Sequence, residues 1–168
     1  IVELNGIVEA PGMDGNIISE GGDGEERSDI TIDDLVGNLD LKKGKGRFKK
    51  IKGKVFARHK ADFRSEHVEG DLEIDGDSET KVSIDLLDGN ALIKIGSLAP
   101  GESPGITTIN GDYTQQAGGT LEIEIQGTDA SVPDYDQIKI NQHTNGSAST
   151  VTLAGTLTVT FLNSYTGF

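Results

Sequence analysis

Apolar and polar residues alternate with a period of two through much of this chain. Between Thr120 and Gln126, the residues Leu121, Ile123 and Ile125 alternate with Thr, Glu and Gln. Successive side chains of an extended strand point to opposite faces, so this pattern gives a strand one apolar and one polar face. The same period recurs at 72–74, 82–86, 138–140 and 157–161, and Gly-containing turn signals such as Asp-Gly-Asn and Asn-Gly-Asp separate the runs. The sequence therefore predicts an all-β fold.

The segment from Phe56 to Val68 is the one candidate for a helix. Its apolar residues do not recur at helical spacing. Instead Val55, Ala57, His59, Ala61 and Phe63 alternate with mostly charged residues. We therefore expect a further strand here, with its charged face directed outward.

A short motif, Gly-x-Leu-x-(Leu/Ile/Val), occurs four times. The copies begin at Gly37, Gly70, Gly119 and Gly155, with spacings of 33, 49 and 36 residues. Each copy supplies a tight corner followed by a strand with one apolar face, which a single strand cannot bury alone. Stacked copies would form a continuous core, as in a β-solenoid. A β-sandwich or jelly roll is the alternative, because any all-β domain can reuse glycine corners.

The chain is expected to divide into two parts of the same solenoid. The stretch "GSLAPGESPG", residues 96–105, holds two of the four prolines and marks a break. We place the boundary here. Residues 1–96 form an irregular, charged β segment, and residues 97–168 form a cleaner solenoid repeat segment.

Charge is distributed unevenly. The formal net charge is −13, yet residues 42–64 contain 11 of the 15 basic residues and a single acid, Asp62, which gives this basic block +10 and the remainder −23. Acidity over most of the chain repels nucleic acid and anionic membranes, and aromatic residues for stacking on bases are few. The chain has no cysteine, which excludes disulfides and thiolate chemistry. No apolar run is long enough to predict a transmembrane segment.

Cations of the basic block form a candidate surface for an anionic ligand. A ladder of cations on a flat β surface suits sulfated or uronate polysaccharide, lipid phosphate or an acidic partner. The alternatives are a solvated face, an edge protected by lysine, or docking on the acidic part of another copy. The candidate residues are Lys49, Lys50, Lys52, Lys54, Arg58 and Lys60.

Acidic turns offer a candidate calcium site at Asp75, Asp77 and Glu79, and no other cofactor is expected. The sequence starting at Asp71 imitates an EF-hand loop, but its twelfth position is Val82 rather than the required glutamate. A second acidic cluster comprises Asp14, Glu20, Asp23, Glu25 and Glu26. The alternative for both clusters is that the carboxylates are simply solvated.

Five short elements of the C-terminal half occur in a recognisable order. They are Ser103-Pro104-Gly105, Gly111-Asp112-Tyr113-Thr114, Gly118-Gly119-Thr120-Leu121, Tyr135-Asp136-Gln137 and Gly155-Thr156-Leu157. This half resembles the repeats of bacterial autotransporter-like and large secreted β-helical surface proteins. The resemblance implies a right-handed parallel β-helix, exported to the bacterial cell surface or beyond, that serves as a non-catalytic stalk, adhesin or layer component.

These observations predict an extracellular structural or adhesive module without catalytic activity. Open solenoid ends expose unpaired strand edges, so we expect association with itself or with neighbouring domains of a longer chain. The candidate edge residues are Val2, Leu4, Leu157, Val159 and Phe161. The alternative is a module that binds polyanionic glycans, or a polysaccharide lyase in which a cation of the basic block neutralises a uronate carboxylate and a base removes the neighbouring proton.

Overall fold

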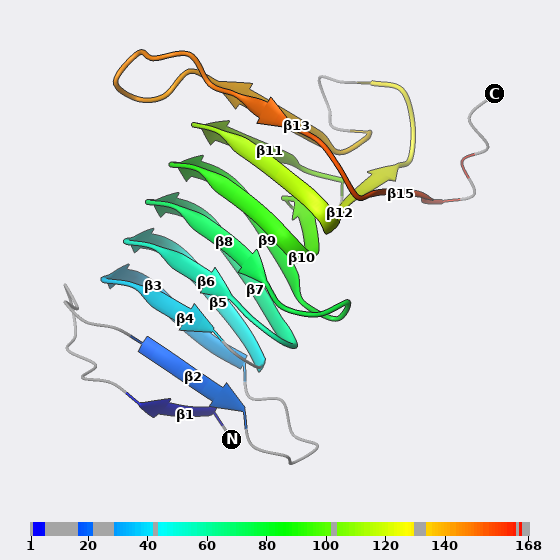
Figure 1. Ribbon diagram of the computed structural model, residues 1–168. Helices are drawn as coiled ribbons and strands as arrows, with labels where there is room; N and C mark the ends of the chain where they lie inside the picture. Colours follow the sequence, from blue (N-terminus) through cyan, green and yellow to red (C-terminus); the bar gives the residue numbers. More distant parts are fainter. Residues whose placement is uncertain are drawn as a thin grey trace.

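The computed structural model describes residues 2–5, 17–21, 29–41, 44–101, 104–129, 134–163 and 165, with side chains at 35–41 and from 46 onward within these ranges. These residues form strands and connecting turns and contain no helix, which confirms the all-β prediction (Figure 1). The strands are β1 (Val2–Asn5), β2 (Ile17–Gly21), β3 (Asp29–Val36), β4 (Leu39–Leu41), β5 (Gly44–Lys52), β6 (Val55–Ala57), β7 (Ala61–Glu69), β8 (Leu72–Asp75), β9 (Lys81–Asp88), β10 (Ala91–Pro100), β11 (Ile106–Asn110), β12 (Tyr113–Ile125), β13 (Gln137–Asn141), β14 (Val151–Thr152) and β15 (Thr156–Phe161).

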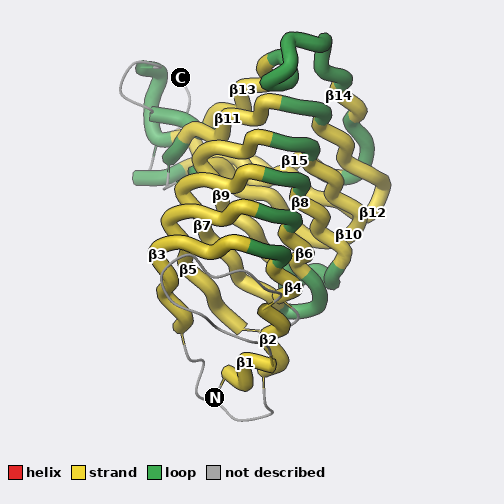
Figure 2. The backbone as a smooth tube through the Cα atoms, turned by 90° about the vertical axis from the view of Figure 1, so that its left-hand side faces the viewer, coloured by secondary structure: helices red, strands yellow, loops and turns green. Residues whose placement is uncertain are grey.

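The strands wind into a β-solenoid of about four turns. On one side β2, β4, β6, β8, β10 and β12 pair in parallel, each with the next; on the other side β3, β5, β7, β9, β11 and β13 do the same. The chain alternates between the two rows, so every circuit stacks on the previous one (Figure 2). This arrangement confirms the solenoid. At the N-terminal end β1 departs from it and pairs antiparallel with β2.

Each long strand bends once, and the bend adds a third straight segment to every circuit. In the pairing of β7 with β9, Ser65 lies opposite Ile84 and the next paired residues are His67 and Leu86. Glu66 and Asp85 are therefore left out of the register at the bend. Along β7 the buried positions accordingly shift from Phe63 and Ser65 to Val68. Further along the solenoid, the end of β10 pairs with the first part of β9, and β11 pairs with the second part.

The core is a continuous column of mainly aliphatic residues that includes two neighbouring phenylalanines with tilted rings. Phe48 and Phe63 lie on neighbouring strands with ring centroids 5.4 Å apart. The residues that the alternation placed inward in β8 and β9, such as Leu72 and Ile84, are fully buried as predicted. The strand predicted through His59 is instead two strands, β6 and β7, because His59 adopts a positive φ of 49° and turns the chain at a corner.

A column of glycines marks one corner of the solenoid, and we define a coil as the chain from one of these glycines to the next. They are Gly37, Gly53, Gly70, Gly89 and Gly111, with spacings of 16, 17, 19 and 22 residues. A Cβ atom on each of the last four would overlap the carbonyl oxygen of the glycine one coil before. Only glycine therefore lets the coils stack this closely.

The predicted repeat mixed two different corners. Gly37 and Gly70 belong to the column just described but are two coils apart, with Gly53 between them. Gly119 instead pairs with Gly96 and stacks under Gly155, which forms a second corner. The irregular spacing of the predicted repeat results from this mixture.

Asn and Asp side chains connect the coils beside the first glycine column. The Lys54 backbone N–H donates to Asn38 Oδ1 at 2.9 Å, and Asn90 N–H donates to Asp71 Oδ1 at 3.2 Å. One coil further, Asp112 N–H donates to Asn90 Oδ1 at 2.9 Å. Each side chain thus satisfies a corner backbone donor that the strand ladders leave unpaired.

The two predicted parts are continuous at position 96, because β10 runs through Gly96 and pairs with β8 before it and with β9 after it. Beyond Leu121, however, β12 pairs with β15 and forms an isolated bridge from Ile125 to Tyr135, and β12 and β15 project from the stack (Figure 1). The expectation that the apolar face of the repeat copy beginning at Gly155 joins the core is therefore wrong, whereas the prediction of Leu157, Val159 and Phe161 as edge residues agrees with their exposure. The apolar side chains of β15 are exposed, and those of β12 are half-buried.

Candidate functional site

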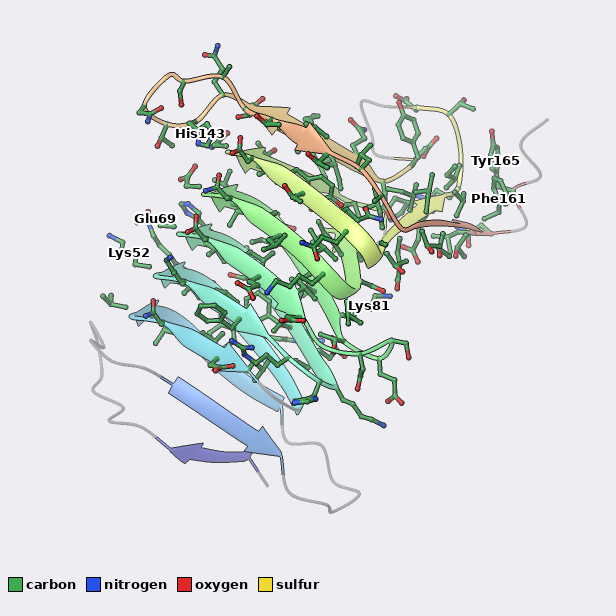
Figure 3. All side chains as sticks on the ribbon, in the orientation of Figure 1. Lys52, Glu69, Lys81, His143, Phe161 and Tyr165 are labelled. Atoms are coloured by element: carbon green, nitrogen blue, oxygen red, sulfur yellow. The ribbon has the colours of Figure 1, made fainter. Side chains whose placement is uncertain are left out.

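Most of the predicted cation ladder is paired with acids of the adjacent coil. Lys50 Nζ lies 2.5 Å from Glu69 Oε1, and Lys52 Nζ lies 3.6 Å from the other oxygen of the same carboxylate. Figure 3 shows Lys52 and Glu69 together at one edge of the solenoid. Lys54 and Asp71 are separated by 3.4 Å. The hydrogen bond from Lys50 holds the pKa of Glu69 below its ordinary value, although burial opposes the shift.

The remaining predicted cations behave similarly. Arg58 Nε donates to Asp40 Oδ1 at 3.1 Å, and Lys60 Nζ donates to Glu79 Oε1 at 2.8 Å. Lys49 is exposed at the bend of β5. The ladder therefore mainly ties coils together, and each partly exposed pair stabilises the fold by about 0–1 kcal/mol. The use of these cations for an anionic ligand stays a prediction.

The predicted calcium ligands each have another partner. Asp75 Oδ2 lies 3.2 Å from Lys94 Nζ, and Asp77 Oδ1 accepts a hydrogen bond from the Glu79 backbone N–H at 2.9 Å within the turn. Glu79 itself pairs with Lys60. Over the described ranges, no group of three or more histidine and acidic side chains is arranged to hold a metal. The second acidic cluster lies outside the residues whose side chains are described.

The C-terminal end of the solenoid presents an apolar edge. β13 pairs with β11, and β14 and β15 pair with β12; the pairings described for the chain place nothing on their outer sides. The predicted residues Leu157, Val159 and Phe161 are exposed by 62%, 42% and 56%, and two unpredicted residues, Val151 and Leu153, by 50% and 69%. We call these five side chains, with the strands β14 and β15 and the loop joining them, the C-terminal edge. Phe161 lies beside Tyr165, with ring centroids 6.3 Å apart (Figure 3).

The opposite end is formed by β1, which carries the predicted edge residues Val2 and Leu4. Its single described partner is β2. The side chains of Val2 and Leu4 lie outside the described set, so this part of the prediction is placed by its backbone alone.

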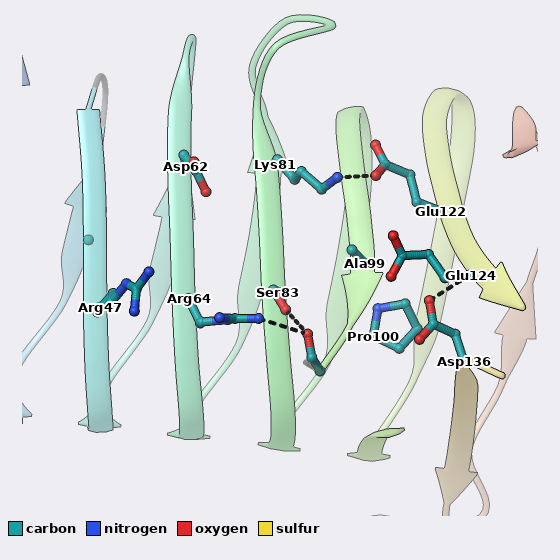
Figure 4. A pocket seen from close by; sticks show the side chains of 12 residues that line it. Arg47, Asp62, Arg64, Lys81, Ser83, Ala99, Pro100, Glu122, Glu124 and Asp136 are labelled. Carbon is teal, nitrogen blue, oxygen red and sulfur yellow. Dashed lines mark hydrogen bonds and ion pairs between the residues drawn. The ribbon is translucent and has the colours of Figure 1, made fainter. Parts of the chain in front are cut away.

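A cleft of about 320 Å³ crosses the outer surface of five strands. Figure 4 shows Arg47, Arg64 and Lys81 together with the acid Asp62 on β5, β7 and β9, and the acids Glu122 and Glu124 on β12. The cleft is lined by Gly46, Arg47, Asp62, Arg64, Lys81, Ser83, Ala99, Pro100, Gly101, Glu122, Glu124 and Asp136. No local sequence pattern marks this cleft, because strand register, rather than spacing along the chain, brings its residues together.

Register places Arg47, Arg64 and Ser83 side by side on β5, β7 and β9. Arg64 Nη2 donates to the Gly101 carbonyl at 3.3 Å, and Ser83 Oγ donates to the same oxygen at 2.6 Å. Arg47 is exposed and makes no ion pair within the part of the chain that the structure describes. The two guanidinium groups therefore form a cationic end of the cleft, while Asp62, two residues before Arg64 on the same face of β7, is in register with Lys81.

Carboxylates form the other end. Glu122 pairs with Lys81, and the two oxygens of the buried Asp136 accept backbone N–H groups from Gly105 at 2.6 Å and Glu124 at 2.7 Å. Burial raises the pKa of Asp136 despite these two hydrogen bonds. Burial, and then the nearby charge of Asp136, raise the pKa of Glu124.

Comparison of the chain with models of known protein families gave no match. Curated protein sequences and solved structures gave none either. Among the described residues, no helix is long and apolar enough to span a membrane.

Proposed function

We propose that this chain is a non-catalytic structural or adhesive segment of an extracellular bacterial surface protein of the autotransporter-like kind, and that it associates with a second copy through the C-terminal edge. The exposed apolar side chains of β15 carry this proposal. Leu157, Val159 and Phe161 alternate along a strand whose one partner among the described strands is β12. Exposed apolar surface next to an unpaired strand edge is characteristic of surfaces that bind another strand.

The charge pattern supports the same role. Natural sheets protect free edges with charged residues, above all lysine. From Ile140 to Phe168 this chain has no Asp, Glu, Lys or Arg, although 26% of its residues are charged. The stacked coils, by contrast, carry ion pairs such as Lys50–Glu69 and Lys94–Glu73. The C-terminal edge therefore lacks the usual protection against pairing.

The partner that fits best is the same edge of a second copy. Two uncharged apolar edges can approach without electrostatic repulsion. Their contact also removes apolar surface from water, and each Å² removed stabilises the dimer by about 25 cal/mol. Residues 1–36 contain ten acids and one base, so the N-terminal ends of two copies repel each other. A symmetric pair joined at the C-terminal edges satisfies both conditions.

Sedimentation equilibrium over a range of concentrations tests the proposal. We expect a reversible shift from one copy to two. Val159→Lys should weaken the dimer by about tenfold or more, because it places a charge among the apolar side chains. Thr160→Lys is the matched control, since residue 160 points to the opposite face of the same strand, and it should change the dissociation constant by less than about threefold. A wild-type chain that remains monomeric at millimolar concentration would reject the proposal.

A further inference from the structure

The cleft on the outer surface of β5, β7, β9, β10 and β12 is separate from the C-terminal edge and has the features of a binding site. Its cationic end contains two arginines on adjacent strands, which lie about 4.8 Å apart. Like charges at this spacing repel unless an anion lies between them. Arg64 is held by the Gly101 carbonyl, whereas Arg47 makes no ion pair in the described chain. This end of the cleft is therefore suited to an anionic group.

Guanidinium groups select the kind of anion. Two neighbouring planar groups offer several N–H donors in one direction, which matches the paired oxygens of a carboxylate. Ser83 follows Arg64 in the same row, and its hydroxyl can accept a hydrogen bond while it donates to Gly101. A carboxylate bound here would thus have a hydroxyl partner beside it.

The remainder of the lining favours a ligand with many hydroxyl groups. Glu122 and Glu124 project from the same face of β12 and provide carboxylate acceptors. Between the two ends lie the small residues Ala99, Pro100 and Gly101, so nothing there forms a pocket for a large apolar side chain. None of the described residues that line the cleft is aromatic, which removes the platform that nucleic-acid bases need. The strands beneath it are paired to each other, so a peptide cannot add as a further strand.

We infer that this cleft binds an acidic saccharide, with a uronate carboxylate between Arg47 and Arg64 and sugar hydroxyls on Ser83 and Glu124. The volume of about 320 Å³ matches a small ligand site and accommodates a short stretch of a longer polymer. The inference goes beyond the proposed structural role and does not depend on dimer formation. It gives a surface module a means of contact with carboxylated glycans.

The test is an NMR titration of the full chain with a galacturonate tetrasaccharide, alongside the methyl ester of the same tetrasaccharide. We expect the free acid to shift the backbone amides of Ser83, Ala99 and Gly101, and the ester to bind at least about tenfold more weakly. Arg47→Gln should weaken binding of the free acid by about tenfold. Lys52→Gln is the matched control, because Lys52 is a partly exposed cation away from the cleft, and it should change binding by less than about twofold.

Three results would overturn the inference. They are no binding of the free acid at millimolar concentration, equal binding of acid and ester, and equal loss of binding in the Arg47 and Lys52 variants. Circular dichroism of both variants confirms that they are folded, and the amide shifts locate the site independently of either substitution. Monomeric Val159→Lys protein should bind the free acid as the wild type does, which separates this inference from the proposed self-association.

Discussion

The carboxylate of Asp136 accepts a hydrogen bond from the backbone N–H of Gly105, 31 residues earlier in the chain, at 2.6 Å. Asp136 is only 7% exposed, and its second carboxylate oxygen accepts the Glu124 N–H. Asp136→Ala would leave two backbone donors without partners, so we expect a loss of about 3 kcal/mol in the free energy of unfolding. Urea denaturation measures this loss. Asp136→Asn retains one carbonyl acceptor and should lose less; an alanine variant as stable as the wild type would contradict this role.

The glycine column should tolerate no side chain. Gly70 has a φ of +149°, and a Cβ atom there would overlap the Gly53 carbonyl oxygen. Gly70→Ala is therefore expected to cost about 3 kcal/mol or more, since backbone must move in two coils. Gly146 is the control, because it also has a positive φ but no atom within 4 Å of the added Cβ. Gly146→Ala should cost only about 1 kcal/mol. Equal thermal stability of the two variants would show that the column does not limit stacking.

Gln115 should anchor β15 to the last complete coil. Its buried amide donates to the carbonyl groups of Gly119 at 3.1 Å and Thr156 at 3.0 Å, and its oxygen accepts the Tyr113 hydroxyl at 3.0 Å. Gln115→Ala removes these three hydrogen bonds, and we expect a loss of about 2–3 kcal/mol. Gln116→Ala changes an exposed neighbour on the same strand and should stay within about 0.5 kcal/mol of the wild type. Hydrogen exchange of the β15 amides should increase in the first variant and not in the second.

Acid should destabilise the fold through Asp88. The hydrogen bond from Asn110 at 2.5 Å, and then one from His67 Nε2 at 3.0 Å, hold the pKa of Asp88 below its ordinary value of 3.8, although burial opposes the shift. A carboxyl group whose pKa is lowered by folding stabilises the native state above the unfolded pKa. That stability is lost as the pH falls through the folded value. Unfolding free energies between pH 6 and about pH 3 should therefore fall less steeply in Asp88→Asn than in the wild type. Identical slopes would exclude this contribution.

Strand positions were predictable because alternation depends only on which face of a strand is buried. Leu72, Ile74, Val82 and Ile84 follow that rule and are buried. The coil length was not predictable. The buried residue that follows each corner glycine by two positions varies in size from alanine, at Ala91, to tyrosine, at Tyr113, and this variation conceals the repeat.

The cleft was missed for a different reason, and the apolar residues of β15 fitted two expectations, a repeat that builds the core and an exposed edge. Arg47 and Arg64 meet through register, which has no signature in local sequence. Leu157 and Val159 have the alternation of a core strand, yet the described chain contains no layer that covers them. Local pattern specifies which residues share a face, but the neighbouring strands decide whether that face is covered.

The glycine corner has a consequence for how such a chain can change length during evolution. Two residues always join the strands there, as at 37–38, 53–54, 70–71, 89–90 and 111–112. The opposite connection grows from two residues after β4 to three after β6 and five after β8. Insertions and deletions are therefore tolerated at one corner and excluded at the other. Surface loops of new shape can accumulate along one ridge of the rod while the glycine ridge preserves its axial alignment.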